Sequence, residues 1–253
     1  MIATHVYDIA AEQAHWWFRS RRHLIDWAIH SMTAYRENAI LEIGCGSGGN
    51  LPTLAKYGNV VGVDIDPDAL AFANRGRSEA WAVEGNAMHL PQAWGDGFDI
   101  LLAADMLEHI VNDRQVLREA YRVLQPGGFI VITVPAMPSL WGPHDETLGH
   151  QRRYTRGELL QKARNAGFQT AYCTHTMALL LPALWAHRHL LKAPWHKAAT
   201  YQNPAARVPP WPANQIMEGI MATERMMLAI GAKWPLGVSL LYVGRKPAYQ
   251  SRP

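Results

Sequence analysis

Cysteine is scarce in this chain, which has 253 residues and only Cys45 and Cys173. Two cysteines cannot form the disulfide framework of a small secreted protein, so we expect a reducing, cytoplasmic setting. The first residues, MIATHVYDIA, lack a basic start and an apolar core, and they predict no secretory signal. A run of about eighteen uncharged apolar residues is also missing, so no membrane-spanning helix is expected.

An excess of charge of one sign is missing as well. The formal net charge is +3, and 18% of the residues are charged. A nucleic-acid-binding domain usually carries a clustered basic stripe, so we expect no nucleic-acid partner. By contrast, hydrophobic residues make up 49% of the chain, which is enough to bury a full core. We therefore expect a single domain over residues 1–253.

Short β-rich runs alternate with helix-length segments between residues 38 and 135. The strands are predicted from AILEIG, VVGVDI, AWAVEGNA, FDILLAA and FIVITVP, and the helices between them from NLPTLAKYG and PDALAFANRG. DRQVLREAYRVLQPGG predicts an amphipathic helix that ends at Pro126 and the two glycines after it. This alternation predicts an α/β fold with a mostly parallel sheet and helices on both faces.

Three segments flank this core. Residues 1–37 predict a helical cap, because EQAHWWFRSRRHLIDWAIHSM is rich in aromatic residues and arginine. Residues 136–215 form a proline-punctuated insertion in which RGELLQKARNAGF predicts a helix. Residues 216–253 predict a helix followed by a last strand, GVSLLYVGRK.

A glycine-rich turn, LEIGCGSGG at residues 41–49, follows the first predicted strand. Its glycines let the backbone turn tightly and approach a ligand, but their spacing fits both a dinucleotide and S-adenosylmethionine (SAM). Glu42 favours SAM, because an acid suits the ammonium of its methionine end and not a pyrophosphate. Asp64 closes the second strand, where a carboxylate can bind both ribose hydroxyls.

Residues 40 to about 168 resemble the class I SAM-dependent methyltransferases, in the small-molecule branch that includes quinone-biosynthesis enzymes. ILEIGCGSG resembles the first motif of this family, VVGVDIDPDAL the second, GNAMHLP the third and FDILLAADMLEHI the fourth. The resemblance implies a Rossmann-like fold, SAM as cofactor and S-adenosylhomocysteine as product. It also implies methyl transfer to the oxygen, nitrogen or carbon of a small organic acceptor.

The resemblance also implies which residues bind the cofactor. Asp64 would bind the ribose, Ile65 would contact the adenine, and Ala104 with Asp105 would border the methionine end. Asn86 stands where the family usually has an aspartate, and its amide oxygen can still accept a hydrogen bond from adenine. In the core, the expected cofactor residues are Glu42, Gly44, Cys45, Gly46, Gly48, Asp64, Ile65, Asn86, Ala87, Ala104 and Asp105.

Residues 12–22, EQAHWWFRSRR, resemble a helix that caps the cofactor pocket in part of this family. Aromatic faces attract a sulfonium cation, so Trp17 or its aromatic neighbours are candidates to line the site. Arg19 or Arg21 is a candidate partner for the methionine carboxylate. The alternative is an amphipathic helix that buries its aromatic residues and exposes its arginines, and both descriptions can hold for different residues.

The acceptor side is predicted in residues 135–155, because ligands of open α/β sheets bind beyond the carboxyl ends of the strands. A hydroxyl or protonated amine acceptor needs a general base, and histidine suits that role near neutral pH. The candidates are His144, His150 and His109, with Tyr154 as an orienting group. The alternative for each is that it only orders its loop.

No metal site is predicted in this loop. Glu146 and His150 have helical spacing, but the prolines and Gly149 argue against a helix there. Without a second pair of cysteine or histidine ligands, the set is incomplete.

Residues 174–215 combine an apolar run with basic residues, tryptophans and prolines. An apolar face beside basic residues is typical of an interfacial helix, so segment 174–197 is a candidate peripheral membrane contact. A lid over a hydrophobic acceptor, a dimer contact or plain packing explains it as well. Two alternatives therefore stay open: a methyltransferase for a lipid or lipid-linked acceptor at a membrane surface, and a SAM-binding protein without catalysis.

Overall fold

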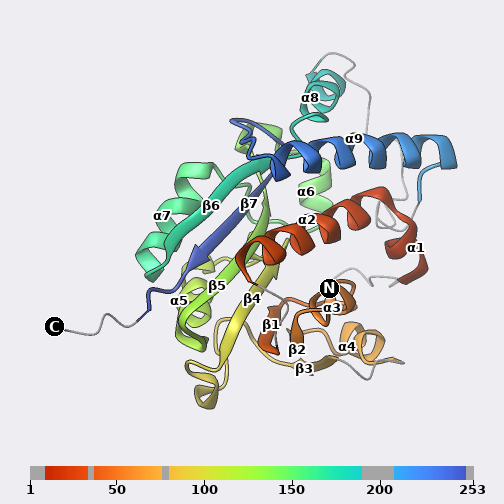
Figure 1. The fold of residues 1–253 in the computed structure, drawn as a ribbon. Helices are drawn as coiled ribbons and strands as arrows, with labels where there is room; N and C mark the ends of the chain where they lie inside the picture. Colours follow the sequence, from red (N-terminus) through yellow and green to blue (C-terminus); the bar gives the residue numbers. More distant parts are fainter. Residues whose placement is uncertain (1–8, 34–36, 76–79, 190–207, 249–253) are drawn as a thin grey trace.

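The computed structural model describes residues 9–33, 37–75, 80–189 and 208–248, built around one seven-stranded sheet (Figure 1). The strand order is β3-β2-β1-β4-β5-β7-β6. The strands are β1 Asn38–Ile43, β2 Gly58–Asp64, β3 Ala80–Glu84, β4 Phe98–Ala104, β5 Leu124–Pro135, β6 Gln169–Thr176 and β7 Ser239–Arg245. Strands β1 to β5 are parallel, and β7 is antiparallel to both β5 and β6. The predicted α/β, Rossmann-like and mostly parallel sheet is confirmed.

Helices cover both faces of this sheet. They are α1 Ile9–Ala14, α2 Trp16–Met32, α3 Leu51–Leu54, α4 Pro67–Ala73, α5 Asp113–Val123, α6 Pro143–Thr147, α7 Arg156–Ala166, α8 Leu181–His189 and α9 Trp211–Ala229. On one face, α5 and α7 pack through residues such as Val116 and Leu159. On the other face, α2, α3, α4 and α9 pack through residues such as Ile25 and Leu228. Burial on both faces explains why the core strands are almost continuously apolar.

Helices α2 and α9 lie side by side, and their contact ties the start of the chain to a much later segment (Figure 1). The buried amide of Asn214 accepts a hydrogen bond from the Trp16 amide at 2.9 Å and donates one to the Ala14 carbonyl at 3.0 Å. Arg19 and Glu218 add an ion pair at 3.0 Å. These contacts fix the junction between α1 and α2 on the first turns of α9.

Two predicted local structures were wrong, and proline explains both. Helix α5 ends at Val123, before Pro126, and residues 124–128 belong to β5. The residue before a proline is disfavoured in helical conformation, so the chain had to be extended already at Gln125. Conversely, Pro143 begins helix α6 in a segment expected to be non-helical. A proline at the first helical position lacks only an N–H that the helix does not use.

The insertion over residues 136–215 contains a strand that the sequence analysis did not predict. Strand β6 pairs with β7, and its last four residues are buried. Segment 174–197 therefore begins in the sheet, and only α8, over 181–189, follows as a described helix. Residues 190–207 lie outside the described residues. Among the described helices, none has the length and apolar character needed to cross a membrane.

We expect Asn214→Ala to destabilise the protein by about 1–2 kcal/mol, because the variant leaves two partly buried backbone groups, the Trp16 amide and the Ala14 carbonyl, without their partner. Urea unfolding of the variant and the parent chain measures this difference. The adjacent, exposed Gln215 supplies a matched control, Gln215→Ala, which should unfold like the parent. Equal free energies of unfolding for the two variants would show that the two hydrogen bonds of Asn214 do not stabilise the protein.

Candidate functional site

The turn after β1 is held tightly between the ends of β2 and β4. Gly44 has φ +70°, and both its amide and that of Cys45 donate to the Val63 carbonyl, at 2.7 and 3.1 Å. A Cβ atom at Gly44 would lie 2.7 Å from the Cβ of Met106, just beyond β4. Only glycine fits there, because any other residue would be strained and would clash. The backbone of this turn is therefore held in one conformation, close to the chain that follows β4.

Asp64 organises this turn from the end of β2. Its carboxylate accepts hydrogen bonds from the Gly46 amide at 2.8 Å and from the Asp66 amide at 3.0 Å. The next side chain, Ile65, is 64% exposed and lies beside the turn as an apolar surface. An acid next to an exposed apolar side chain suits a sugar joined to a flat ring.

Glu42 and Gly48 shape the same turn from inside. The buried Glu42 carboxylate accepts a hydrogen bond at 2.7 Å from the Asn50 amide group, at the N-cap of α3. Gly48 has φ +76°, and its amide donates to the Cys45 carbonyl at 2.9 Å. Glu42 therefore braces the turn where it enters α3.

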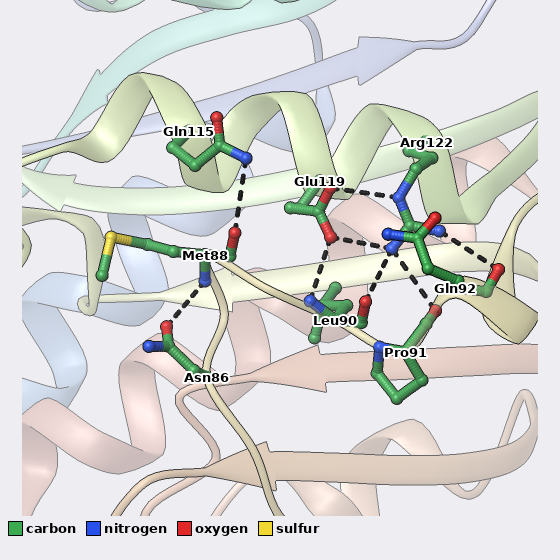
Figure 2. A network of polar contacts seen from close by, with 8 residues as sticks. All are labelled: Asn86, Met88, Leu90, Pro91, Gln92, Gln115, Glu119 and Arg122. Atoms are coloured by element: carbon green, nitrogen blue, oxygen red, sulfur yellow. Dashed lines mark hydrogen bonds and ion pairs between the residues drawn. The ribbon is translucent and has the colours of Figure 1, made fainter.

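Asn86 and Ala87 lie in the loop after β3, which helix α5 holds in place (Figure 2). Glu119 accepts from the Leu90 amide at 2.9 Å, and Arg122 donates to the Leu90 carbonyl at 2.9 Å. The amide oxygen of Asn86 accepts from the Met88 amide at 2.9 Å, which makes a local turn. Since this oxygen already has one donor, its second lone pair is the one available to a ligand.

The α1–α2 segment covers the glycine turn and the end of β4. The Glu12 carboxylate accepts from the Ser47 hydroxyl at 3.0 and 3.1 Å. Arg21 reaches Asp105 at 2.7 Å, and its guanidinium lies 4.6 Å from the centre of the Trp17 ring. Arg19 instead pairs with Glu218 on α9, away from Asp105. Glu12 is not among the candidates from the sequence, because nothing in its local pattern points to a partner 35 residues later.

Asp105 itself has an unusual backbone. It follows Ala104 at the end of β4 and has φ +49°, a left-handed conformation that is costly for a residue with a side chain. Its amide donates to the Thr133 carbonyl of β5 at 2.9 Å. The strained turn directs the chain away from the cofactor residues and into the 3₁₀ helix η2, Leu107–His109.

The three histidines proposed as bases come together beyond β4 and β5. The rings of His109 and His150 lie 4.7 Å apart, and those of His144 and His150 lie 6.5 Å apart. Fully buried Asp145 accepts from His150 Nδ1 at 3.0 Å and from Arg153 Nε at 2.7 Å. Burial alone would raise the pKa of Asp145, but the bonds from His150 and Arg153 hold it at about 2. The ionised carboxylate fixes the His150 ring and leaves Nε2 for a ligand.

Glu108 joins this cluster from η2, and the sequence analysis did not propose it. Its side chain is buried, and its Oε2 has no hydrogen-bond partner among the described residues. Burial, followed by the nearby charge of Asp105, raises the pKa of this carboxyl group. One donor atom from each of Glu108, His109 and His150 lies within 4.8 Å of the others. The adjacent Glu108 and His109 were the available signal, but only the fold shows that His150 meets them.

Tyr154 belongs to a second network, which is centred on Asp113. It is fully buried, and its hydroxyl donates to Asp113 at 2.6 Å. Asp113 also pairs with Lys162 at 2.6 Å and Arg152 at 2.8 Å. Burial and the Asp113 carboxylate raise the pKa of Tyr154. This network ties α5 to α7, and the Tyr154 hydroxyl also lies 3.3 Å from the Leu107 carbonyl at the start of η2.

Comparisons with known proteins find similarity to methyltransferases. Residues 41–132 match a family described as "Methyltransferase domain". A "Probable S-adenosylmethionine-dependent methyltransferase" of Mycolicibacterium smegmatis is 27% identical over 164 residues, 63% of this chain and 61% of that protein. A demethylmenaquinone methyltransferase of Lactobacillus johnsonii is 36% identical over 109 residues, 39% of this chain and 44% of that protein.

A solved structure shows the same fold. Phosphoethanolamine N-methyltransferase 2 of Haemonchus contortus, in complex with SAM, superposes with a TM-score of 0.61 at 15% identity. The match covers 97% of this chain and 58% of that one. In all three cases the chain spans less than two thirds of the protein that it matches.

The Asp145 network predicts a loss of stability in acid. Because the folded pKa lies below the ordinary value of 3.8, the ionised carboxylate stabilises the fold above about pH 4 and loses this effect as the pH falls toward 2. The full contribution is about 2 kcal/mol. Chemical unfolding at pH 7 should therefore show Asp145→Asn less stable by at least about that amount, with a smaller difference near pH 3. Exposed Glu146 gives the control, Glu146→Gln. Its effect on the free energy of unfolding should be small at pH 7 and should not shrink in the same way near pH 3.

Proposed function

We propose that this protein transfers the methyl group of SAM to a small organic acceptor, and the match of residues 41–132 to a methyltransferase domain supports this. The acceptor atom forms a bond to the methyl carbon while the carbon–sulfur bond breaks, and S-adenosylhomocysteine leaves. The observation that supports this proposal best is the short connection from Asp105 to His109. Only three residues separate the acid to which we assign the methionine end from the first histidine of the cluster.

The cofactor residues follow from the fixed turns. We assign the ribose to Asp64, the adenine to Ile65 with Asn86 and Ala87, and the methionine end to the glycine turn with Asp105. Arg21 supports the last assignment, because a guanidinium that reaches Asp105 can also bind the carboxylate of a methionine. Trp17 already holds this guanidinium against its ring, so its face suits a cation such as the sulfonium.

The acceptor lies on the other side of Asp105, under residues of the 136–215 segment. Its nucleophilic atom meets His150 Nε2, and this lone pair can hold the proton that a hydroxyl or protonated amine must lose. Asp145 supports this role, because its ionised carboxylate binds Nδ1 and so orients the imidazole. His109 and His144 complete the wall around the acceptor. Tyr154 acts through the loop that it anchors.

A lipid or lipid-linked acceptor is the second candidate, and exposed apolar side chains favour it. Leu179 and Trp185, before and on α8, are 39% and 49% exposed, and Trp211 at the start of α9 is 75% exposed. Both elements flank residues 190–207. An apolar rim of this kind suits peripheral contact with a membrane or a hydrophobic acceptor.

Methyl-labelled SAM with a cell extract of the source organism tests the function. We expect label in an acceptor with the parent chain and none with Asp64→Asn, whose affinity for SAM should fall at least about tenfold. Exposed Asp68, in the first turn of α4, supplies the control Asp68→Asn, which should bind SAM normally.

The phase that carries the label separates the candidates. Label in the aqueous phase supports a small polar acceptor, and label in the organic phase supports the lipid candidate. A chain that binds SAM but labels neither phase would contradict transfer and leave a SAM-binding protein. Failure to bind SAM at all would contradict the whole proposal.

A further inference from the structure

We propose that Glu108, His109 and His150 bind one divalent transition-metal ion at the acceptor end of the site. The inference deepens the proposed function and rests on it for the nature of the acceptor, whereas ion binding itself can be measured alone. The three donor atoms lie within 4.8 Å of one another. Bonds of about 2.1 Å to one ion bring such donors to roughly 3–3.5 Å, a change that small side-chain rotations provide.

The surroundings of His150 resemble the support that metal-binding histidines need. Its Nδ1 is held at 3.0 Å by Asp145, which itself is fully buried and fixed by Arg153. A carboxylate in this position orients the ring, sets Nε2 as the free donor and makes the imidazole a better ligand. The ligand is therefore oriented before any ion arrives.

Glu108 gives an independent reason for a cation. A buried carboxylate with an unpartnered oxygen is costly unless a proton or a cation neutralises it. The charges that act on Glu108 are those of Asp105, Arg21 and Arg153. The two arginines are themselves paired with Asp105 and Asp145. With Glu108 ionised, three negative charges face two positive ones. A bound divalent ion would offset this excess.

The donor set also selects the ion and the acceptor. Two imidazole nitrogens and one carboxylate oxygen suit Zn²⁺, Mn²⁺ or Co²⁺, whereas Mg²⁺ and Ca²⁺ prefer oxygen ligands. Three protein ligands leave a position for an oxygen of the acceptor. A hydroxyl bound there loses its proton to solvent more easily, and the resulting oxygen forms the bond to the methyl carbon as the carbon–sulfur bond breaks. In this arrangement His150 Nε2 binds the ion instead of the proton that the acceptor loses. The acceptor is then a compound with a hydroxyl group.

Cobalt titration of the purified full chain tests the site, because bound Co²⁺ gives visible absorption bands and calorimetry gives its stoichiometry. We expect one Co²⁺ per chain, and at least about tenfold weaker binding for His109→Ala and Glu108→Gln. His144→Ala removes the third imidazole of the cluster but none of the three donors. It should keep the Co²⁺ affinity of the parent, and Mg²⁺ should not displace the bound Co²⁺.

Two outcomes would overturn the inference: no saturable Co²⁺ binding to the parent chain, or equal Co²⁺ affinity in the parent, His109→Ala and Glu108→Gln. SAM binding, measured on the same preparations, keeps the two proposals apart. A chain that binds SAM and transfers methyl groups without any ion retains the proposed function and loses the metal site. A chain that binds Co²⁺ but not SAM retains the metal site and loses the proposed function.

Discussion

The close contact between Gly44 and Met106 sets the distance between the two halves of the site. Because Gly44 has no side chain, the chain that leaves β4 can pass directly over the glycine turn. The same chain then carries Asp105 toward the cap and His109 toward the histidine cluster. A larger residue at position 44 would push these two segments apart, and a methyl group held on one side would no longer reach an acceptor on the other.

The geometry of the proposed cofactor half could be predicted from the sequence because its signals are local. A glycine turn directly after a strand, and an acid at the end of the next strand, need only a few adjacent residues and the rule that parallel strands end at one edge. The same holds for the alternating strands and helices that gave the fold class. Where proline was involved, the local signal was misjudged at Pro126 and Pro143, because its effect depends on its position in the element.

The acceptor half depends on contacts between distant residues, which a single sequence does not reveal. Glu12 and Ser47 are 35 residues apart, and His150 meets His109 only after β5 and α6 have returned the chain to the same edge. The two adjacent arginines of GHQRRY look equivalent in the sequence, yet Arg152 binds Asp113 while Arg153 binds Asp145. Arg152 therefore supports the contact between α5 and α7, whereas Arg153 supports the imidazole of His150 through Asp145.

The sheet order also determines when the molecule can be completed during synthesis. Strand β6 lies at the edge beyond β7, although β7 is made later, so β6 has no partner strand until the end of the chain emerges from the ribosome. The Trp16–Asn214 bond likewise waits for a residue 198 positions later. A nascent chain can therefore assemble strands β1 to β5 first, before the α1–α2 junction is fixed on α9. Helix α9 and strand β7 then complete this contact and the sheet together.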